Sequence, residues 1–239
     1  MKVGVVIPLY NEEMNVVPLV GKLLSALGHF DGEIVLVDDG STDETGRLID
    51  ELADENDQVV AIHHLENSGY AQALKTGFKR GIDDMLDVIC VMDGDMTHEA
   101  GDISRFLMEI ERGADVVIGS RYVENGKMVD VPFRRVFISK AANFLFRLLL
   151  GLKVRDITSG YRAYRRKVLE KINIDSDSFH IHLEITAKSN NAGFKIREIP
   201  IVLKGRRFGA SKFNLISTWW KYLTFVIKFR IRQMGKRKK

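Results

Sequence analysis

The first half of the chain alternates between short apolar, β-branched runs and longer stretches with helical spacing. The runs with strand character are Val3–Pro8, Glu33–Val37, Val59–His63, Val88–Met92 and Asp115–Ile118. The stretches with helical spacing are Glu13–Leu27, Thr42–Glu55, Tyr70–Ile82 and Asp102–Arg112. Strands that alternate with helices of this length form βαβ units, whose parallel sheets are covered by helices on both faces. We therefore predict an α/β fold built on a mostly parallel sheet.

The pattern changes after Tyr122. We expect a polar loop, a helix and an ordered loop of small polar residues, over Glu124–Pro132, Arg134–Leu150 and Val154–Tyr164. A helix, a strand, a basic loop and a last helix follow, over Phe179–Ala192, Arg197–Leu203, Gly205–Lys212 and about Asn214 to Arg232. No repeat divides the chain, and 239 residues are enough for one large domain.

The charge of the chain is distributed unevenly. The segment Ile199–Lys239 carries twelve Lys and Arg and no Asp or Glu, whereas the rest has 24 basic and 32 acidic side chains. A basic end on an acidic body indicates an anionic partner, and nucleic acid and anionic lipid are the two candidates. The acidic body and the lack of an aromatic-basic recognition motif argue against nucleic acid.

The sequence predicts neither secretion nor a membrane span. The single cysteine, Cys90, cannot form a disulfide within the chain, so a reducing compartment is expected. The apolar run after Met1 is shorter than the roughly 7–15 residues of a secretory signal. The segments Phe144–Leu152 and Leu215–Ile231 either fall short of the about 20 apolar residues that span a bilayer or carry basic side chains.

Polar residues follow each predicted strand at its carboxyl end. They lie in Pro8–Glu12, Asp38–Asp43, Asn67–Gly69, Asp93–Asp95 and Gly119–Tyr122. Ligands of open α/β sheets bind beyond the carboxyl ends of the strands. The sequence therefore predicts a site at one edge of the sheet that gathers carboxylates, glycines and an arginine.

Two aspartates, Asp93 and Asp95, flank Gly94 directly after the most apolar predicted strand. Where the chain turns at a strand end, two such carboxylates can converge on one cation. Mg²⁺ and Mn²⁺ take hard oxygen ligands, often one or two carboxylates together with substrate phosphates. We therefore predict a divalent metal that bridges a diphosphate at this point, although an isolated Asp-x-Asp is more often a solvated loop.

The segment Val37–Asp43 permits two interpretations. Its Ser, Thr and acidic residues could simply start a helix, because they cap the free N–H groups and favour the helix dipole. Alternatively, Asp39 could accept a hydrogen bond from a nucleotide base. Both interpretations can hold together.

Seven segments, in order along the chain, resemble glycosyltransferase family 2. They are VVIPLYNEE, VDDGSTD, NSGYAQALKTG, VMDGDMTH, VIGSRYVENG, DITSGYRAYRR and RRFGASKF, and the resemblance covers about residues 3–225. Those after Arg121 are similar to the subgroup that contains dolichol-phosphate mannosyltransferase and other polyprenyl-phosphate glycosyltransferases. The resemblance implies a GT-A fold, which is Rossmann-like, with amphipathic interface helices near its C-terminal end.

The resemblance also implies a role for individual residues. Asp93 and Asp95 would engage the metal and the diphosphate, Gly94 would contact the donor through its backbone, and Arg121 would lie between donor and acceptor phosphates. The nucleoside would be held by Pro8, Tyr10, Glu12, Val37 and Asp39, and the late loop would close over the donor with Arg206 or Arg207 and with Lys212.

One position departs from the family pattern. Relatives often carry a metal-binding Gln two residues after the second Asp, whereas this chain has Thr97, so a hydroxyl or a water would substitute. The Gln-x-x-Arg-Trp block of the processive polysaccharide synthases is missing from the sequence, which argues against polymerisation.

The implied reaction is an inverting transfer of a hexose from a nucleotide-sugar to a polyprenyl or dolichyl phosphate. Mannose from GDP-mannose is the first choice, and glucose or an N-acetylhexosamine from a UDP donor stays open. A hydroxyl acceptor is the alternative, and it would need a carboxylate base. An inactive regulatory subunit is disfavoured by the intact Asp93 and Asp95.

An acceptor phosphate has a second pKa of about 6 and is already ionised, so it needs positioning more than deprotonation. We assign Arg134, Arg135 and Ser139 to this phosphate. The alternative is a basic helix entry that faces solvent. His180 and His182 alternate like metal ligands, but without placed partners two such histidines are more often structural.

The last predicted helix is amphipathic and basic. Its apolar positions are Ile216, Trp219, Trp220, Leu223, Ile227 and Ile231, and its other face carries Ser217, Lys221, Thr224, Lys228 and Arg232. Such helices lie in membrane interfaces, although packing on the protein is the alternative. We therefore expect a catalytic domain over residues 1–212, with an acceptor segment at about 124–164, and an interface helix and tail over 213–239. The expected location is the cytoplasmic face of a membrane, with room for a membrane-anchored partner subunit.

Overall fold

The alternation of the first half produces the predicted strands and helices. The computed structural model describes residues 1–28, 30–206 and 222–231. The strands are β1 (Lys2–Leu9), β2 (Asp31–Asp38), β3 (Val59–His63), β4 (Val88–Val91) and β5 (Val116–Ser120). The helices between them are α1 (Glu13–Leu27), α2 (Thr45–Glu55), α3 (Tyr70–Asp83) and α4 (Ile103–Glu111), the last preceded by a 3₁₀ turn, Ala100–Asp102. The prediction of an α/β fold is confirmed.

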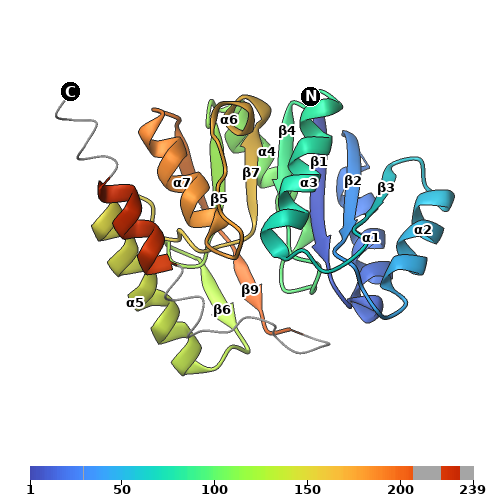
Figure 1. Cartoon of the computed structure of the whole chain (residues 1–239), viewed down its shortest axis with the longest axis horizontal. Coiled ribbons are helices and arrows are strands. Elements are labelled where there is room, and N and C mark those ends of the chain that lie inside the picture. Colours follow the sequence, from blue (N-terminus) through green and yellow to red (C-terminus); the bar gives the residue numbers. More distant parts are fainter. Residues whose placement is uncertain (29, 207–221, 232–239) are drawn as a thin grey trace.

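The central sheet has seven strands in the order β3-β2-β1-β4-β7-β5-β8, in which β7 and β8 span Arg162–Arg165 and Ile196–Pro200. All neighbouring pairs run parallel except those of β7, which is antiparallel to both β4 and β5. The carboxyl ends of β1, β2, β4 and β5 therefore meet at one edge of the sheet, the lower edge in Figure 1.

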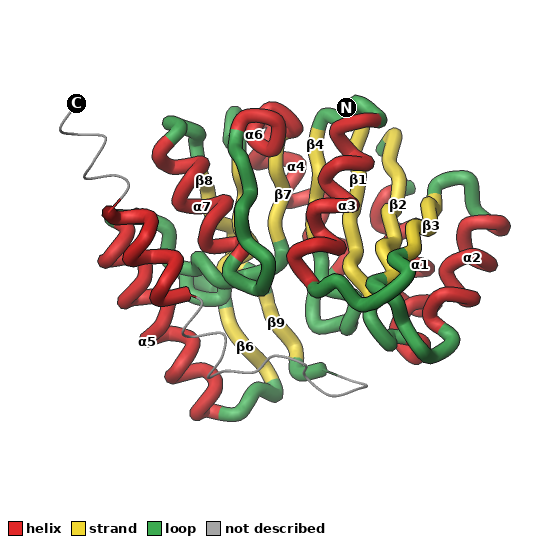
Figure 2. Tube along the Cα trace, in the orientation of Figure 1, coloured by secondary structure: helices red, strands yellow, loops and turns green. Residues whose placement is uncertain are grey.

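Helices cover both faces of this sheet (Figures 1 and 2). Alternate residues of β1 point to opposite sides: Val3, Val5 and Ile7 pack with α1 and α4, whereas Val6 packs with α3. The second face is covered by α3, α6 (Arg166–Lys171), α7 (Ile181–Asn191) and part of α5 (Phe133–Leu150). Two apolar cores, one per face, hold the sheet between them.

Strand β7 corrects the prediction of a loop that extends to Tyr164. Central strands are normally apolar, and a segment that begins with arginine does not look like one. Arg162 is nevertheless fully buried, because its guanidinium donates to the backbone oxygens of Ile157, Ser159 and His182 and to the hydroxyl of Thr186. These bonds satisfy the charged group inside the protein.

A second, smaller sheet lies beyond the functional edge. Its two parallel strands are β6 (Lys127–Val129) and β9 (Val202–Lys204). The first falls where we expected only a polar loop, and the second splits the predicted late strand in two after Pro200. Figure 1 shows this pair beside α5, next to the carboxyl ends of the main strands.

The described part of the last helix, residues 222–231, packs on the protein. Tyr222 and Val226 are buried in the core of the second face, and the ring of Tyr222 stacks on Phe146 of α5 with centroids 5.4 Å apart. Ile227 and Ile231 stay exposed, as expected for the apolar face. Arg207, Lys212, Trp219 and Trp220 lie outside the described residues. Among the described helices, none is both long enough and apolar enough to cross a bilayer.

Candidate active site

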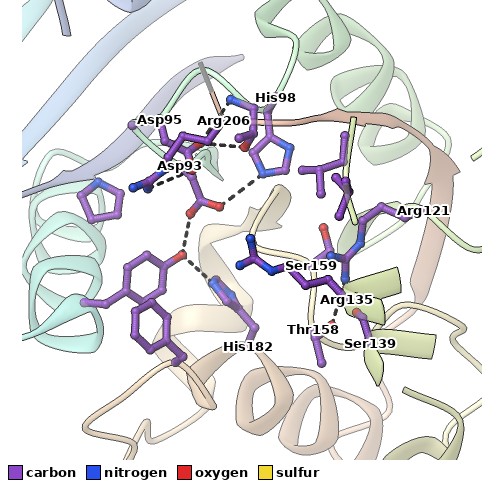
Figure 3. Close-up of a pocket in the computed structure, with 18 of the residues that line it drawn as sticks. Asp93, Asp95, His98, Arg121, Arg135, Ser139, Thr158, Ser159, His182 and Arg206 are labelled. Atoms are coloured by element: carbon purple, nitrogen blue, oxygen red, sulfur yellow. Dashed lines mark hydrogen bonds and ion pairs between the residues drawn. The ribbon is translucent and has the colours of Figure 1, made fainter. Parts of the chain in front are cut away.

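A cavity of about 650 Å³ opens at the carboxyl edge of the sheet. Two groups of side chains face each other across it (Figure 3): Asp93, Asp95 and Arg206 on one side, and Arg121, Arg135, Ser139 and Thr158 on the other. In the first group, Asp93 and Asp95 follow β4 and Arg206 follows β9 (Val202–Lys204). The second group belongs to the segment after β5, to α5 and to the loop before β7. We call these the carboxylate side and the arginine side.

The predicted nucleoside residues divide into two classes. Pro8, Tyr10, Glu12 and Asp39 line the cavity. Val37 does not: it is fully buried within β2 and packs in the second core. The turn after β1 is sharp, since Asn11 has a φ of 52°, and its side-chain oxygen accepts a bond from the backbone of Thr42, 2.8 Å away. This bond joins the first two loops of the carboxylate side.

Asp39 is fixed by the loop that enters α3. One carboxylate oxygen accepts from the backbone N–H of Ser68 at 3.0 Å and contacts His64 Nδ1 at 2.7 Å. The other accepts from the backbone N–H of Gly69 at 2.8 Å. Gly69 has a φ of 92°, a conformation that strongly favours glycine. Each carboxylate oxygen accepts about two bonds, so Asp39 retains capacity for a ligand N–H.

Asp95 is held by Thr97 and by Arg206. The hydroxyl of Thr97 donates to one Asp95 oxygen at 2.6 Å, and the backbone N–H of Thr97 donates to the same oxygen at 3.1 Å. Nε and Nη2 of Arg206 both lie 3.0 Å from the other oxygen, and Nη2 is also 3.4 Å from a carboxylate oxygen of Glu12. Arg206 therefore connects the end of the described late segment to two acids of the carboxylate side.

Asp93 is enclosed by groups from three other segments. Its Oδ1 accepts from the hydroxyl of Tyr70 at 3.0 Å, and its Oδ2 lies 3.3 Å from Nε2 of His98. A Cβ atom on Gly160 would come within 3.1–3.2 Å of both carboxylate oxygens and of the Tyr70 hydroxyl. Burial alone would raise the pKa of Asp93, but the hydrogen bond and charge of His98 and the hydrogen bond from Tyr70 outweigh burial and lower it. Asp93 is therefore an ionised carboxylate with a fixed orientation.

A second buried histidine, His182 of α7, stands behind Tyr70. Its Nε2 is 2.8 Å from the tyrosine oxygen. Burial, followed by the nearby Arg162, lowers the pKa of His182 to about 3, so its ring is neutral. Burial also raises the pKa of Tyr70, which keeps its proton and donates it to Asp93. The proton between Tyr70 and His182 must then come from Nε2, and this assigns the tautomer.

The donors at this edge fit a small divalent cation. Two carboxylates and the hydroxyl of Thr97 are hard oxygen ligands. Among residues 1–28, 30–206 and 222–231, no group of three or more His, Cys, Asp or Glu side chains is arranged to hold a metal. A pair of carboxylates whose remaining ligands come from substrate phosphates is the usual arrangement for Mg²⁺. His182 contacts Tyr70 through its Nε2. The structural interpretation of the two histidines stays a prediction.

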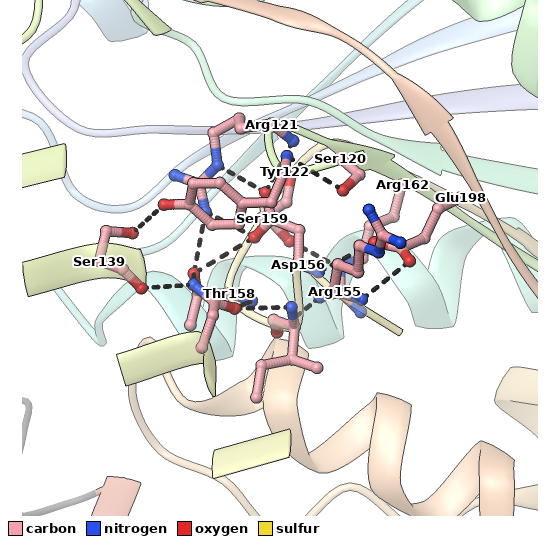
Figure 4. A network of polar contacts seen from close by, with 12 residues as sticks. Ser120, Arg121, Tyr122, Ser139, Arg155, Asp156, Thr158, Ser159, Arg162 and Glu198 are labelled. Carbon is pink, nitrogen blue, oxygen red and sulfur yellow. Dashed lines mark hydrogen bonds and ion pairs between the residues drawn. The ribbon is translucent and has the colours of Figure 1, made fainter. Parts of the chain in front are cut away.

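On the arginine side, Arg121 is held rigidly by Asp156 (Figure 4). Its Nε and Nη2 donate to the two carboxylate oxygens at 2.7 and 2.6 Å, and its backbone N–H donates to Oδ2 at 2.9 Å. Nη2 also donates to the hydroxyl of Thr158 at 2.9 Å. Its other terminal nitrogen, Nη1, has no partner within the described part of the chain. Burial disfavours ionisation of Asp156, but the Arg121 charge outweighs burial and lowers its pKa.

Of the residues that we assigned to an acceptor phosphate from the sequence, two line the cavity and one does not. Arg135 and Ser139, one helical turn apart on α5, line the cavity, and the Ser139 hydroxyl accepts from the hydroxyl of Tyr122 at 2.6 Å. Arg134 is exposed and is not part of the cavity lining. Beyond Arg135 the lining becomes apolar, with Ile138, Ala142, Phe146, Phe179 and Tyr222.

Sequence reasoning missed several of these groups. Tyr70, His98, Asp156 and Thr158 all line or support the cavity, and His182 was considered only as a metal ligand. Asp156 and Thr158 stand in the DITSGYRAYRR segment, which the resemblance to the family had singled out, but neither residue was assigned a role. The bonds from His98 and Tyr70 to Asp93 join positions 5 and 23 residues apart, which no local pattern reveals.

Comparison with known proteins gives consistent matches. Residues 4–173 match the model of the family described as Glycosyl transferase family 2. The polyprenol monophosphomannose synthase of Mycolicibacterium smegmatis is 42% identical over 88% of this chain and 80% of that protein. The undecaprenyl-phosphate mannosyltransferase of Micrococcus luteus is 38% identical over 90% and 88%. The dolichol-phosphate mannosyltransferase of Pyrococcus furiosus is 38% identical over 89% of this chain, which spans 59% of that longer protein.

Among solved structures, the chain resembles glucosyl-3-phosphoglycerate synthase from Mycobacterium tuberculosis, crystallised with Mn²⁺, UDP-glucose and phosphoglyceric acid. The TM-score is 0.66 at 19% identity, over 98% of this chain and 80% of that one. At this level of identity the likeness establishes the fold.

Proposed function

Because the chain belongs to glycosyl transferase family 2 and is a glycosyltransferase, we propose that it transfers mannose from GDP-mannose to the phosphate of a polyprenyl phosphate. The observation that carries the proposal is the division of the cavity into a carboxylate side and an arginine side, with an apolar lining beyond the arginines. The relatives that match most of the chain carry names of mannosyltransferases that act on polyprenyl phosphates.

The carboxylate side suits a nucleotide-sugar. Asp39, with its remaining hydrogen-bonding capacity, would accept from the base, and Pro8, Tyr10 and Glu12 would line the nucleoside. Asp93 and Asp95 would hold Mg²⁺ or Mn²⁺ together with the diphosphate, and Thr97 would orient Asp95. The bound cation would neutralise the negative charge that develops on the departing nucleotide. Arg206, already bonded to Asp95 and Glu12, would lie over the donor, and we extend this role to Lys212 from the sequence alone.

The arginine side suits the acceptor phosphate. The Asp156 carboxylate holds the Nε–Nη2 edge of the Arg121 guanidinium and leaves Nη1 for a phosphate oxygen. Arg135 and Ser139 would contact the same phosphate from α5. The phosphate is ionised before it binds, so these residues would position and partly neutralise a nucleophile rather than deprotonate it. The phosphate oxygen would attack the sugar carbon from the side opposite the departing nucleotide. This direct displacement would invert the configuration of that carbon.

The apolar lining suits the first part of a lipid chain. Ile138, Ala142 and Phe146 of α5 and Tyr222 of the last helix continue the cavity away from Ser139. This surface would exclude water from the phosphate and accommodate isoprene units. An acceptor with a phosphate and no lipid would lose the contribution of this surface.

We further propose that α5 and the last helix lie in a membrane interface. On α5, Phe133, Phe137, Phe144 and Leu148 are between 61% and 80% exposed. The same helix exposes Arg134 and Lys140, and the helix of residues 222–231 exposes Ile227 with Lys228. A helix that presents apolar and basic side chains together binds the headgroup region of anionic bilayers. Which face of the membrane it binds stays a prediction from the sequence.

The test is a matrix of donors and acceptors in vesicles with Mg²⁺ or Mn²⁺. GDP-mannose, UDP-glucose and UDP-N-acetylglucosamine are each paired with a polyprenyl phosphate and with the dephosphorylated polyprenol, and lipid-linked sugar is measured. We expect product from GDP-mannose with the phosphate and none with the alcohol. Product with the dephosphorylated polyprenol would contradict the proposal that the acceptor is a phosphate. Product from a UDP-sugar but not from GDP-mannose would contradict the proposal that the donor is GDP-mannose.

A further inference from the structure

Asn143 is a buried amide in the middle of α5, a helix that is otherwise largely exposed. It is 1% exposed, whereas Phe144 beside it is 61% exposed. An amide in this position, next to apolar side chains of the second core, loses its water and must find partners inside the protein.

All four hydrogen-bonding positions of the Asn143 side chain are used. Its nitrogen donates to the backbone oxygen of Ser139 at 2.8 Å and to the hydroxyl of Thr158 at 2.9 Å. Its oxygen accepts from the backbone N–H groups of Ile157 and Thr158 at 2.8 and 3.2 Å. Three of these four bonds therefore join α5 to the loop before β7.

That loop is the part of the chain that fixes Arg121. Asp156, the residue before Ile157, holds the Arg121 guanidinium through two bonds, and Thr158 accepts a third from the same group. Figure 4 shows these contacts together with Ser139 of α5. From the opposite direction, Glu198 accepts the backbone N–H groups of Arg155 and Asp156 at 2.8 and 2.9 Å. Asn143 is thus the contact from α5, and Glu198 the contact from β8.

The position of this contact matters because the arginine side is built from two separate elements. Arg135 and Ser139 belong to α5, whereas Arg121 follows the end of β5 and is bonded to Asp156. Three phosphate-binding groups act together only if their spacing is fixed. The bond from Tyr122 to Ser139 is one connection across this boundary. The three bonds of Asn143 are a second, of which the one from the backbone N–H of Ile157 is buried and the two to Thr158 are partly buried.

We propose that Asn143 is a positioning residue that sets the spacing between Arg121 and the α5 groups Arg135 and Ser139, an inference that rests on the proposed acceptor phosphate. Asn143 itself touches no substrate in this arrangement. It acts through the backbone of Ile157 and Thr158 and through Asp156. Its removal should impair use of the acceptor and leave donor binding intact, because within the described residues neither Asp93 nor Asp95 bonds directly to Asn143 or to the segment 156–158.

The test compares Asn143→Leu, which keeps the number and branching of the side-chain heavy atoms and removes all four bonds, with Leu150→Ala. Leu150 is also a buried residue of α5, and it does not line the cavity. The first readout is backbone hydrogen exchange, since the amides of Ile157 and Thr158 report directly on the bonds to Asn143. The amides of Arg155 and Asp156, which are bonded to Glu198, serve as the internal reference.

The second readout is steady-state kinetics with polyprenyl phosphate in vesicles. We expect kcat/KM for the acceptor to fall on the order of 100-fold in Asn143→Leu, as for a misplaced reactant, with donor KM changed less than about twofold. Leu150→Ala should lower the unfolding midpoint without faster exchange at Ile157 or a selective acceptor defect. Asn143→Leu combined with Thr158→Val should be no worse than Asn143→Leu alone.

The outcomes separate the two proposals. An active wild type whose Asn143→Leu variant keeps its acceptor kcat/KM would overturn the positioning role and leave the function intact. An equal acceptor defect in Leu150→Ala would also overturn it, because general loosening of α5 would then explain the loss. A wild type that makes no product with any donor and acceptor pair would overturn the proposed function, and the positioning role with it.

Discussion

At the residue scale, the two aspartates of the Asp-Gly-Asp motif have different surroundings. Asp95 contacts Arg206 and Thr97, whereas Asp93 is enclosed by Tyr70, His98 and the backbone at Gly160. Because the Arg206 side chain is partly exposed, we expect Asp95 to exchange it for a cation that binds. Asp93 keeps one orientation, because its neighbours belong to separate and well-packed segments.

Replacing Tyr70 with Phe removes the proton that Asp93 accepts and the oxygen to which His182 donates. The ring still stacks on Phe179, with centroids 4.9 Å apart. The buried Nε2–H of His182 loses its partner, so we expect a loss of about 1–3 kcal/mol in unfolding free energy. We also expect about a tenfold loss in kcat/KM for the donor, because the Asp93 carboxylate is less constrained. Urea unfolding and donor kinetics measure the two effects.

The control for this variant is Tyr164→Phe. Tyr164 is a buried tyrosine of β7 that does not line the cavity. An equal loss of donor kcat/KM in both variants would contradict the specific role of the Tyr70 hydroxyl.

Replacing Asp156 with Asn tests the pairing with Arg121. The variant leaves a buried guanidinium without its carboxylate, and we expect about 3–5 kcal/mol of destabilisation at neutral pH. The pKa of Asp156 is lowered by folding, so its contribution is fully present above the ordinary Asp pKa of about 3.9 and is lost as pH falls through the lower folded value. The difference in unfolding free energy between wild type and variant should therefore narrow below about pH 4.

Denaturant unfolding at several pH values checks this expectation. Asp175→Asn is the matched comparison, because Asp175 pairs with Lys188 at 2.8 Å near the surface, where ion pairs contribute about 0–1 kcal/mol. A difference at Asp156 that stays constant down to pH 3 would show that the charge of the carboxylate is not what stabilises the loop.

Residue-scale prediction from sequence succeeded where one rule applied. The carboxyl ends of parallel strands share an edge, and this rule gathered Asp39, Asp93, Asp95 and Arg121 correctly in one cavity. Two assignments made on other grounds do not line the cavity: Val37, which the resemblance implied and which is buried within β2, and Arg134, which was assigned at a helix entry. Asp39, two residues after Val37, and Arg135, next to Arg134, do line it, so side-chain direction decided the outcome.

At the element scale, α5 combines two functions on one helix. One face carries Arg135, Ser139 and Asn143 toward the cavity and the loop before β7, and the other exposes a row of phenylalanines. Its sequence predicted the helix within one residue of its start, because a long apolar body and the terminal Gly151 mark it clearly. Strand β7 was not predicted, because only tertiary contacts satisfy its arginine.

Replacing Phe137 and Phe144 of α5 with Ser should weaken binding to anionic vesicles. Burial of one aromatic side chain contributes about 1.5–3 kcal/mol, so each exposed ring should change the partition coefficient roughly 10- to 100-fold if it enters the bilayer fully. Vesicle sedimentation at fixed lipid concentration measures this. Nucleotide binding in solution should not change.

Leu65→Ser provides the comparison for these rings. Leu65 is fully exposed in the loop after β3, among the carboxylate-side elements rather than on α5. Equal loss of vesicle binding in this variant would indicate non-specific adsorption, and unchanged binding in the phenylalanine variants would contradict the proposed interface.

At the scale of the whole molecule, ligand binding should raise the free energy of unfolding of the chain. A ligand that binds only the folded chain stabilises it by RT ln(1 + [L]/Kd), about 2.7 kcal/mol at a hundredfold excess over Kd. We expect GDP with Mn²⁺ to raise the unfolding temperature of the wild type and to have no such effect on Asp95→Ala. Excess chelator should remove both the shift and the transfer activity of the wild type.

Thermal scans with GDP, with Mn²⁺ and with both give the measurement. The Asp95→Ala variant without ligand should unfold near the wild-type temperature, since within the described residues Asp95 bonds a partly exposed arginine and its neighbour Thr97 and nothing else. A full GDP-induced shift in chelator would contradict the role of the metal in donor binding.

The antiparallel course of β7 has a consequence for how such enzymes diversify. Because this strand is antiparallel to its neighbours, its N-terminal end lies at the edge of the sheet that carries the cavity. There the backbone of Gly160 lies against Asp93, and Asp156 bonds Arg121. The segment Asp156–Gly160 thus contacts both the carboxylate side and the arginine side of the cavity. Exchange of the α5 region between relatives could bring in a new acceptor while the activated sugar stays the same, provided that the entry of β7 travels with it.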